Sequence, residues 1–122
     1  MTSREELEDR LKKFSLRVLN LVRNLPKSSE NKIYGNQVIR SSSSVGANYS
    51  EALCAHTKKD FVHDLNKCRK EIKETIYWLE LISGANPSIK KRMNGLLRES
   101  QEIFKIFTSS VKTIKVGKNN KS

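Results

Sequence analysis

Two histidines and two aspartates lie close together near the middle of the chain, where they could form a metal site. His56 and His63 are seven positions apart and could share one face across a helix boundary, with Asp60 and Asp64 close by. Zinc sites use such ligands, but the chain has no His-Glu-x-x-His and no Cys-x-x-Cys spacing. A polar junction between two helices explains the same residues more simply. We therefore predict no metal and no cofactor.

Nucleophilic residue types are present without a pattern that indicates catalysis. The sequence has no glycine-rich phosphate loop, and no Ser-His-Asp or Cys-His order stands out. Single residues of these types prove nothing, because a catalytic triad is defined by its geometry. The protein is therefore not expected to be an enzyme. The two cysteines, Cys54 and Cys68, suit a reducing compartment, in which thiols behave as small buried hydrophobes.

The elements that would position these residues follow from hydrophobic spacing. Apolar residues recur at alternating intervals of four and three, which is typical of an amphipathic helix. In the first series, Ser3 and Glu6 form a capping-box start, and Pro26 predicts a helix end near Leu25. The members of that series are Leu7, Leu11, Phe14, Val18, Leu21 and Leu25.

The second predicted helix begins after a cap at Ser28 or Ser29 and contains a run of serines at positions 41–44. Serine has a low helix propensity, so a loop is the competing interpretation of residues 40–48. The 3.5-residue spacing nevertheless continues through the run to Leu53. We therefore predict a helix, whose small residues allow close approach of a neighbouring helix.

A third helix is predicted from a Thr57 cap to Ile82, with Gly84 as its C-cap, and a fourth helix is predicted to begin near Pro87. Four such helices with short connections favour an all-α, antiparallel up-down-up-down bundle. Residues 1–116 are expected to form this single domain. Residues 117–122 have no apolar content and are predicted to be a disordered basic tail.

Polar residues on the second and third helices match one another if the two helices form a hairpin that turns near Thr57. Residue numbers of facing positions then add up to about 114, so the register predicts a network that fixes the alignment of the helices. The predicted members are Arg40, Ser44, Asn48, Glu51, Glu71 and Glu74, with Asn66 or Lys67 opposite Asn48 and His63 opposite Glu51. An active site at Arg40, Glu71 and Glu74 is the alternative, but buried charges are usually paired for structural reasons. The same rule separates the two cysteines, which are expected not to form a disulfide.

The formal net charge of +11 raises the odds of a polyanionic partner. Residues 1–29 carry a net charge of +3 and residues 87–113 one of +4, whereas residues 30–86 are nearly neutral. No exposed aromatic series accompanies the basic run, so phosphate contacts are expected rather than base stacking. The candidate nucleic-acid-binding residues are Lys90, Lys91, Arg92, Arg98, Lys105, Lys112, Lys115 and Lys118.

Several short motifs on the second and third helices occur together in a fixed order. They are Ile39-Arg40-Ser41 with Ser44, Ala47-Asn48, Glu51-Ala52, Asp60-Phe61 and Glu74-Thr75-x-Tyr77-Trp78-Leu79-Glu80-Leu81, preceded by Phe14-x-x-Arg17 and Leu25-Pro26. Over residues 7–83 the chain thereby resembles the four-helix-bundle proteins encoded in 23S ribosomal RNA intervening sequences. The last helix fits only as a generic amphipathic helix.

The resemblance implies a closed up-down bundle and a homo-oligomer, which is a pentameric ring in known relatives. A related branch includes the accessory variability determinant of diversity-generating retroelements, a basic pentamer that binds nucleic acid and a reverse transcriptase. The residues shared with the family look structural. Tyr49 differs from the usual aliphatic residue, which we interpret as repacking.

Together these patterns predict a non-catalytic, homo-oligomeric, nucleic-acid-binding protein, with RNA as the expected ligand. The alternative is a helical protein–protein interaction module or an accessory subunit of an enzyme that acts on nucleic acid. Apolar residues beyond one stripe per helix are expected to meet a neighbouring subunit: Leu16, Leu19, Val22, Val62, Ile76, Trp78 and Phe104. The sequence shows neither a signal peptide nor a membrane-spanning segment, so a cytoplasmic location is predicted.

Overall fold

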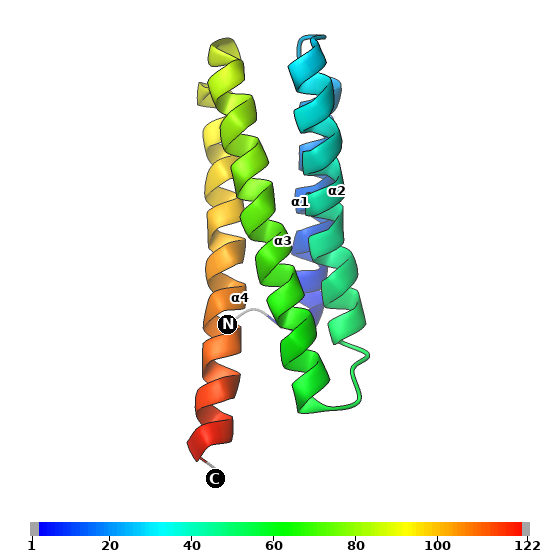
Figure 1. The fold of residues 1–122 in the computed structure, drawn as a ribbon, viewed down its shortest axis with the longest axis vertical. Coiled ribbons are helices and arrows are strands. Elements are labelled where there is room, and N and C mark those ends of the chain that lie inside the picture. Colours follow the sequence, from blue (N-terminus) through cyan, green and yellow to red (C-terminus); the bar gives the residue numbers. More distant parts are fainter. Residues whose placement is uncertain (1–2, 121–122) are drawn as a thin grey trace.

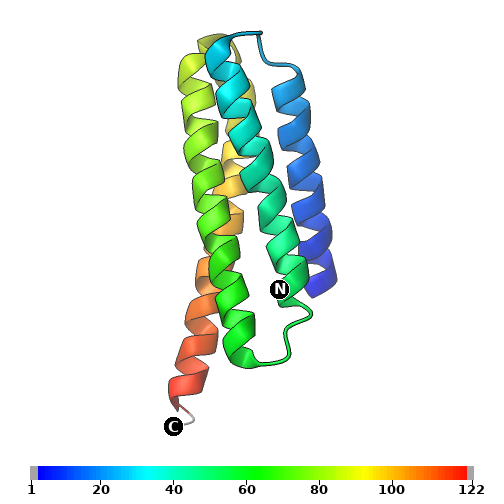
Figure 2. The ribbon, with the colours of Figure 1, turned by 45° about the vertical axis from the view of Figure 1, so that its right-hand side comes forward.

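The computed structural model describes the backbone of residues 3–120 and the side chains of residues 3–114. Its four α-helices are α1 (Arg4–Arg23), α2 (Ser29–Ala52), α3 (Lys58–Ala85) and α4 (Asn94–Asn120), with the short 3₁₀ helices η1 (Pro87–Ile89) and η2 (Lys91–Met93) before α4. The connections after α1 and α3 lie at one end of the bundle, and the connection after α2 lies at the other (Figures 1 and 2). The predicted all-α, antiparallel up-down-up-down bundle is confirmed. No helix in the described part of the chain is long and apolar enough to span a bilayer.

Polar caps begin the first three helices as the sequence predicts. Ser3, Ser28 and Thr57 each have extended backbone geometry, and each side-chain oxygen accepts the backbone N–H of the residue three positions later at 3.1 Å. Each cap therefore satisfies one backbone donor that a helix start leaves unpaired.

The end of α3 differs from the prediction, because Asn86 and not Gly84 caps this helix. The Asn86 backbone N–H donates to the carbonyl oxygen of Ile82, and its side chain exchanges two hydrogen bonds of 2.8 Å with the side chain of Asn31 on α2. This buried amide pair ties the end of α3 to the start of α2. Pro87 then begins η1, so α4 starts at Asn94, later than the sequence indicates.

The serine-rich segment of α2 is helical throughout, which excludes the competing loop. Ser41 and Ser42 are buried, and their small volume allows α2 and α3 to pack closely, as predicted. The hydroxyl oxygens of Ser41 and Thr75 lie 2.8 Å apart across this contact. Small hydroxyl residues thus fill a helix–helix interface while their polar atoms remain paired.

Replacing Thr75 with valine is expected to lower the free energy of unfolding by about 1–2 kcal/mol, because the buried Ser41 hydroxyl loses its cross-helix partner. Ser41→Ala should lower the free energy of unfolding less in the Thr75→Val background than in the wild-type protein, since the double variant leaves no unpaired hydroxyl at this contact. Urea unfolding of the four proteins of this cycle measures the coupling. Strictly additive effects would show that the two hydroxyls do not interact.

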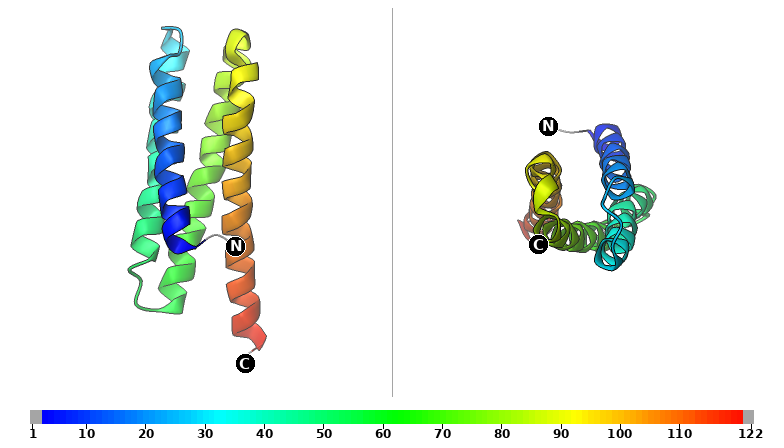
Figure 3. Two further views of the ribbon diagram at one scale, coloured as in Figure 1. Left: turned by 180° about the vertical axis from the view of Figure 1, so that it is seen from behind. Right: turned by 90° about the horizontal axis from the view of Figure 1, so that it is seen from above.

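At the C-terminal end, α4 continues to Asn120 and extends past the ends of the other helices (Figure 1). The helix therefore enters the segment 117–122 that was predicted to be a disordered tail, and residues 121 and 122 lie outside the described residues. Viewed along the bundle, each helix lies beside its neighbour in sequence, while α1 and α4 face each other across the more open side (Figure 3). The two most basic helices thus lie on the same open side.

Candidate nucleic-acid interface

A row of cations lies on the outer face of α4. Arg98, Lys105 and Lys112 are all exposed and are spaced seven residues apart, which is nearly two helical turns and places them about 10.5 Å apart along one face. The residues that α4 buries in the core, such as Ser100, Ile103 and Phe107, lie on the opposite face. We call Arg98, Lys105 and Lys112 the α4 cation row.

The α4 cation row is not neutralised by carboxylates. Within the described side chains, none of its three cations has an Asp or Glu oxygen within 4.0 Å. The two acidic residues of α4 instead face Arg10 of α1: Glu99 lies 2.7 Å from it and Glu102 lies 3.6 Å from it. The row's cations are thus exposed to anions in solvent without being held in ion pairs, with Glu102 lining the same surface groove as Arg98 and Lys105.

Arg10 and Glu99 form a two-pronged ion pair that links α1 to α4. Arg10 Nε donates to Glu99 Oε2 at 2.8 Å, and Arg10 Nη2 donates to Glu99 Oε1 at 2.7 Å. The hydrogen bonds from Arg10 hold the pKa of Glu99 below its usual value, and the positive charges of Arg10 and Arg17 lower this pKa further. Burial of the carboxylate acts against this shift. The pair thus ties α1 to α4 across the open side of the bundle.

Glu99→Gln is expected to lower the free energy of unfolding by about 1–2 kcal/mol at neutral pH. Because folding depresses the pKa of Glu99, its stabilisation is present above the ordinary value of 4.5 and is lost as the pH falls through the lower value in the folded state. The stability difference between the two proteins should therefore shrink in acid. Urea unfolding of both proteins across the acidic range tests this, and a difference that stays constant with pH would contradict it.

The remaining candidate cations lie on either side of the row. Lys90, Lys91 and Arg92 are exposed on the η1–η2 segment that leads into α4. The side chains of Lys115 and Lys118 lie outside the described residues. The structure therefore brings Lys90, Lys91 and Arg92 to the end of the bundle where α3 connects to α4.

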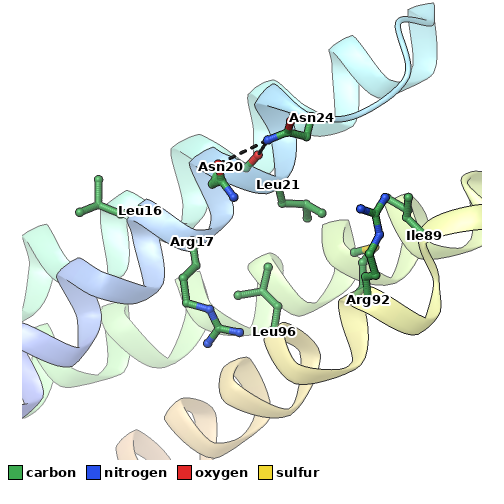
Figure 4. Close-up of a pocket in the computed structure, with 9 residues that line it drawn as sticks. Leu16, Arg17, Asn20, Leu21, Asn24, Ile89, Arg92 and Leu96 are labelled. Carbon is green, nitrogen blue, oxygen red and sulfur yellow. Dashed lines mark hydrogen bonds between the residues drawn. The ribbon is translucent and has the colours of Figure 1, made fainter.

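A cleft of about 460 Å³ lies between α1 and the η1–η2–α4 segment, and we call it the α1–α4 cleft (Figure 4). Its apolar lining includes Leu21, Met93 and Leu96. Its polar lining consists of Arg17, Asn20, Asn24 and Arg92. The guanidinium of Arg17 extends from α1 toward α4, where a Cβ placed on Gly95 would lie 3.6 Å from Arg17 Nη2 (Figure 4).

Of the two cleft cations, only Arg92 is predicted from the sequence to bind nucleic acid. Arg17 is noted only as part of the Phe14-x-x-Arg17 motif of the family resemblance. The amides of Asn20 and Asn24 carry no signal in the sequence. The positive charge of residues 1–29 indicates that α1 is basic, but spacing alone does not show that α1 faces α4. The cleft is therefore a feature of the tertiary structure.

The predicted polar network between α2 and α3 is present only in part. Arg40 contacts Glu71 at 3.4 Å and also pairs with Glu74, whose carboxylate accepts a 2.9 Å hydrogen bond from Trp78 Nε1. The side chain of Arg40 is 47% exposed, so this is a surface network and not the buried one that the register argument assumed. The hairpin register itself agrees with these contacts.

The other predicted pairs of that network are not among the hydrogen bonds and ion pairs of the described side chains. Asn48 donates to the carbonyl oxygen of Ser44, one turn back on its own helix, at 2.8 Å. An amide reaches that carbonyl locally, without a partner across the hairpin. The hydrogen bonds of the described side chains do not join Ser44 to Glu71 or Glu51 to His63. The Ser41–Thr75 pair is a buried polar contact of this hairpin that the predicted network did not include.

The residues considered for metal binding or nucleophilic catalysis are dispersed. His56, Asp60 and His63 are exposed, and the described part of the chain holds no group of three or more His, Cys, Asp or Glu side chains placed to share a metal ion. Cys54 is exposed and Cys68 is buried, and both are free thiols. Burial raises the pKa of Cys68 to about 12, so this thiol stays protonated and unreactive.

The chain matches one family model and is similar to solved structures. The chain matches the family model described as 23S rRNA-intervening sequence protein over residues 6–109, a range that reaches well into α4. It is also similar to a crystal structure of a protein of unknown function from the S23 ribosomal protein family of Bacteroides thetaiotaomicron. The TM-score is 0.79 and the identity 33%, and the alignment covers 89% of this chain and 97% of that chain. No curated protein matches the sequence.

Proposed function

The chain belongs to the family of 23S rRNA-intervening sequence proteins, and on that basis we propose that it is a non-catalytic, homo-oligomeric protein that binds nucleic acid, primarily RNA. In this proposal the basic surface of α4 contacts phosphates, and the protein acts in the cytoplasm. The reducing conditions there suit the free thiols Cys54 and Cys68.

The observation that supports this proposal best is the unpaired α4 cation row. A solvated basic face is common, and on its own it would not indicate a ligand. Here Arg10 pairs with Glu99 and Glu102, and no cation of the row forms an ion pair in the described side chains, nor do Arg17 and Arg92 of the cleft. Cations at intervals of about 10.5 Å along an exposed helix can contact several phosphates of one strand at once.

The arrangement favours shape and charge over base sequence. The aromatic side chains of α4, Phe104 and Phe107, are partly or fully buried and do not form an exposed stacking surface. Lysine and arginine contacts to phosphate carry no sequence information. The expected ligand is therefore structured or looped RNA, bound with little preference for sequence.

A titration of labelled RNA with the protein, followed by fluorescence anisotropy at about 50 mM salt, tests the proposal, since phosphate-dominated binding is strongest at low salt. Saturable binding to RNA but not to an uncharged polymer supports it. Absence of binding at this salt concentration would refute it.

Assembly into oligomers, a pentamer as the family resemblance implies, is the second part of the proposal. It is supported by three large apolar side chains that are more than half exposed: Leu16 at 64%, Ile33 at 58% and Tyr77 at 55%. Of the residues predicted for an interface, Leu16 is exposed, whereas Ile76 is only 7% exposed and belongs to the core of a single bundle. Light scattering at micromolar protein should show a multimer, and a monomer would contradict this part.

The second candidate function is a protein–protein interaction module, which a cluster of aromatic rings on α2 and α3 favours. The rings of Tyr34 and Trp78 lie 6.1 Å apart and those of Tyr77 and Trp78 5.2 Å apart, beside the Arg40–Glu74 pair. Exposed tyrosine, tryptophan and arginine are enriched at protein interfaces. Capture of one defined protein from nuclease-treated extract, with no RNA binding by the purified protein, would favour this alternative.

A further inference from the structure

The α1–α4 cleft combines unpaired positive charge with an apolar floor. Within the described side chains, neither Arg17 nor Arg92 has a carboxylate oxygen within 4.0 Å. Glu99 is the acidic residue whose pKa responds to Arg17, but both of its oxygens already accept hydrogen bonds from Arg10. Two guanidiniums at the edge of one cleft therefore remain available to an anion, and such groups bind phosphate oxygens in pairs.

The remaining polar groups of the cleft suit a planar, hydrogen-bonding ligand. Asn24 Nδ2 donates to the Asn20 carbonyl oxygen at 2.7 Å and lies 3.3 Å from Asn20 Oδ1. Asn20 Nδ2 and Asn24 Oδ1 form no hydrogen bond among the described side chains, so one amide donor and one amide acceptor near the C-terminal end of α1 stay available at the cleft. Amide donors and acceptors of this kind can form hydrogen bonds with the edge of an unstacked base.

The floor of the cleft supplies an apolar contact on the other side. Leu21, Met93 and Leu96 line the space between the two guanidiniums. At about 460 Å³ the cleft falls within the range of roughly 300–1,000 Å³ that is typical of small-ligand sites. A protein segment is a poorer match, because covering two unpaired guanidiniums with apolar surface would cost desolvation free energy without a compensating charge.

We propose that the α1–α4 cleft holds one unstacked nucleotide of the bound RNA. Its flanking phosphates contact Arg17 and Arg92 at the two sides of the cleft, its base rests on the apolar floor between them, and the base edge faces the amides of Asn20 and Asn24. This inference rests on the proposed RNA binding, and it adds a defined pocket to the phosphate contacts of the α4 cation row. Unpaired bases in loops and bulges are the parts of RNA that can be splayed out in this way.

The test uses a short single-stranded RNA with the fluorescent base 2-aminopurine at one internal position, and the same RNA with an abasic site there. The protein variant is Arg17→Gln/Arg92→Gln, and Lys12→Gln/Arg23→Gln is its control. The control removes the same charge from exposed positions of α1 that do not line the cleft. Circular dichroism and light scattering establish that both variants keep the fold and the oligomeric state.

The wild-type protein should change the 2-aminopurine fluorescence and bind the intact RNA more tightly than the abasic RNA. The cleft variant should lose both effects and bind intact RNA about tenfold to a hundredfold more weakly, whereas the control should keep both. If the wild type binds RNA but treats intact and abasic RNA alike, the pocket is refuted and the phosphate contacts stand. If it binds no RNA, the proposed function fails as well. If the cleft variant alone dissociates the oligomer, the occupant is a second copy of the chain and the proposal is overturned.

Discussion

Reversing all three charges of the α4 cation row, by Arg98→Glu, Lys105→Glu and Lys112→Glu together, is expected to weaken RNA binding by at least about a hundredfold. A cation next to a polyanionic surface contributes about 1 kcal/mol, so three lost contacts amount to about two orders of magnitude, before the added repulsion of three carboxylates is counted. The three side chains are exposed on the face of α4 opposite the core, so the fold should be unaffected. Fluorescence anisotropy with labelled RNA at low salt measures the loss.

A matched control separates the position of these charges from their number. Lys32, Lys59 and Lys70 are exposed on α2 and α3 and have no carboxylate within 4.0 Å in the described side chains. Reversing them changes the net charge of +11 by the same amount as reversing the row. The control should weaken binding only severalfold, through the general field of the protein. Equal losses in the two triple variants would mean that the row is not the binding surface.

Phe107→Ala is expected to cost the largest amount of stability, about 3–5 kcal/mol of the free energy of unfolding. The Phe107 side chain is 1% exposed, and its ring meets the Tyr49 ring edge-on, with centroids 5.8 Å apart. Its removal leaves a cavity between α2 and α4 and a buried tyrosine without its aromatic neighbour. A loss of this size is a large part of the roughly 5–15 kcal/mol that keeps a typical domain folded.

Phe104→Ala is the control for that prediction, because Phe104 lies one turn away on the same helix and is only partly buried. Its ring contacts the Lys73 ammonium at 5.3 Å, and its loss should cost about 1–2 kcal/mol. Urea unfolding monitored by circular dichroism gives both values. Similar losses for the two variants would contradict the placement of Phe107 in the core.

Local features of the sequence account for most of the fold. The caps at Ser3, Ser28 and Thr57 follow from residue type, because each needs only the N–H group three residues away. The serine-rich run is correctly predicted to be helical, because the 3.5-residue apolar spacing continues through it although serine has a low helix propensity. The hairpin register also follows, since one turn near Thr57 fixes every facing pair of α2 and α3. The Ser41–Thr75 and Arg40–Glu74 pairs agree with it.

The sequence could not predict which of several possible hydrogen-bond partners a polar side chain takes in the folded structure. Asn86 caps α3 because Asn31, 55 positions earlier, exchanges amide hydrogen bonds with it, whereas the sequence offers Gly84 as a better local stop. Asn48 donates to the carbonyl oxygen of Ser44 on its own helix, a local partner that the pairing of facing positions does not consider. The candidate site likewise has one part that the sequence predicts and one part that it does not. The cation row is visible as charges seven residues apart, but the cleft depends on how Arg17 of α1 lies against η2 and α4.

The dependence of RNA affinity on salt tests the central claim, phosphate binding by the α4 cation row, most directly. For single strands the slope of log affinity against log salt is about −0.7 for each phosphate neutralised, so the three cations of the row should contribute about −2. The wild-type protein is expected to show a slope at least that steep. The triple charge reversal of the row should be shallower by about 2, and the reversal on α2 and α3 should keep the wild-type slope. A wild-type slope near zero, or the same slope in the wild type and the row variant, would contradict the account.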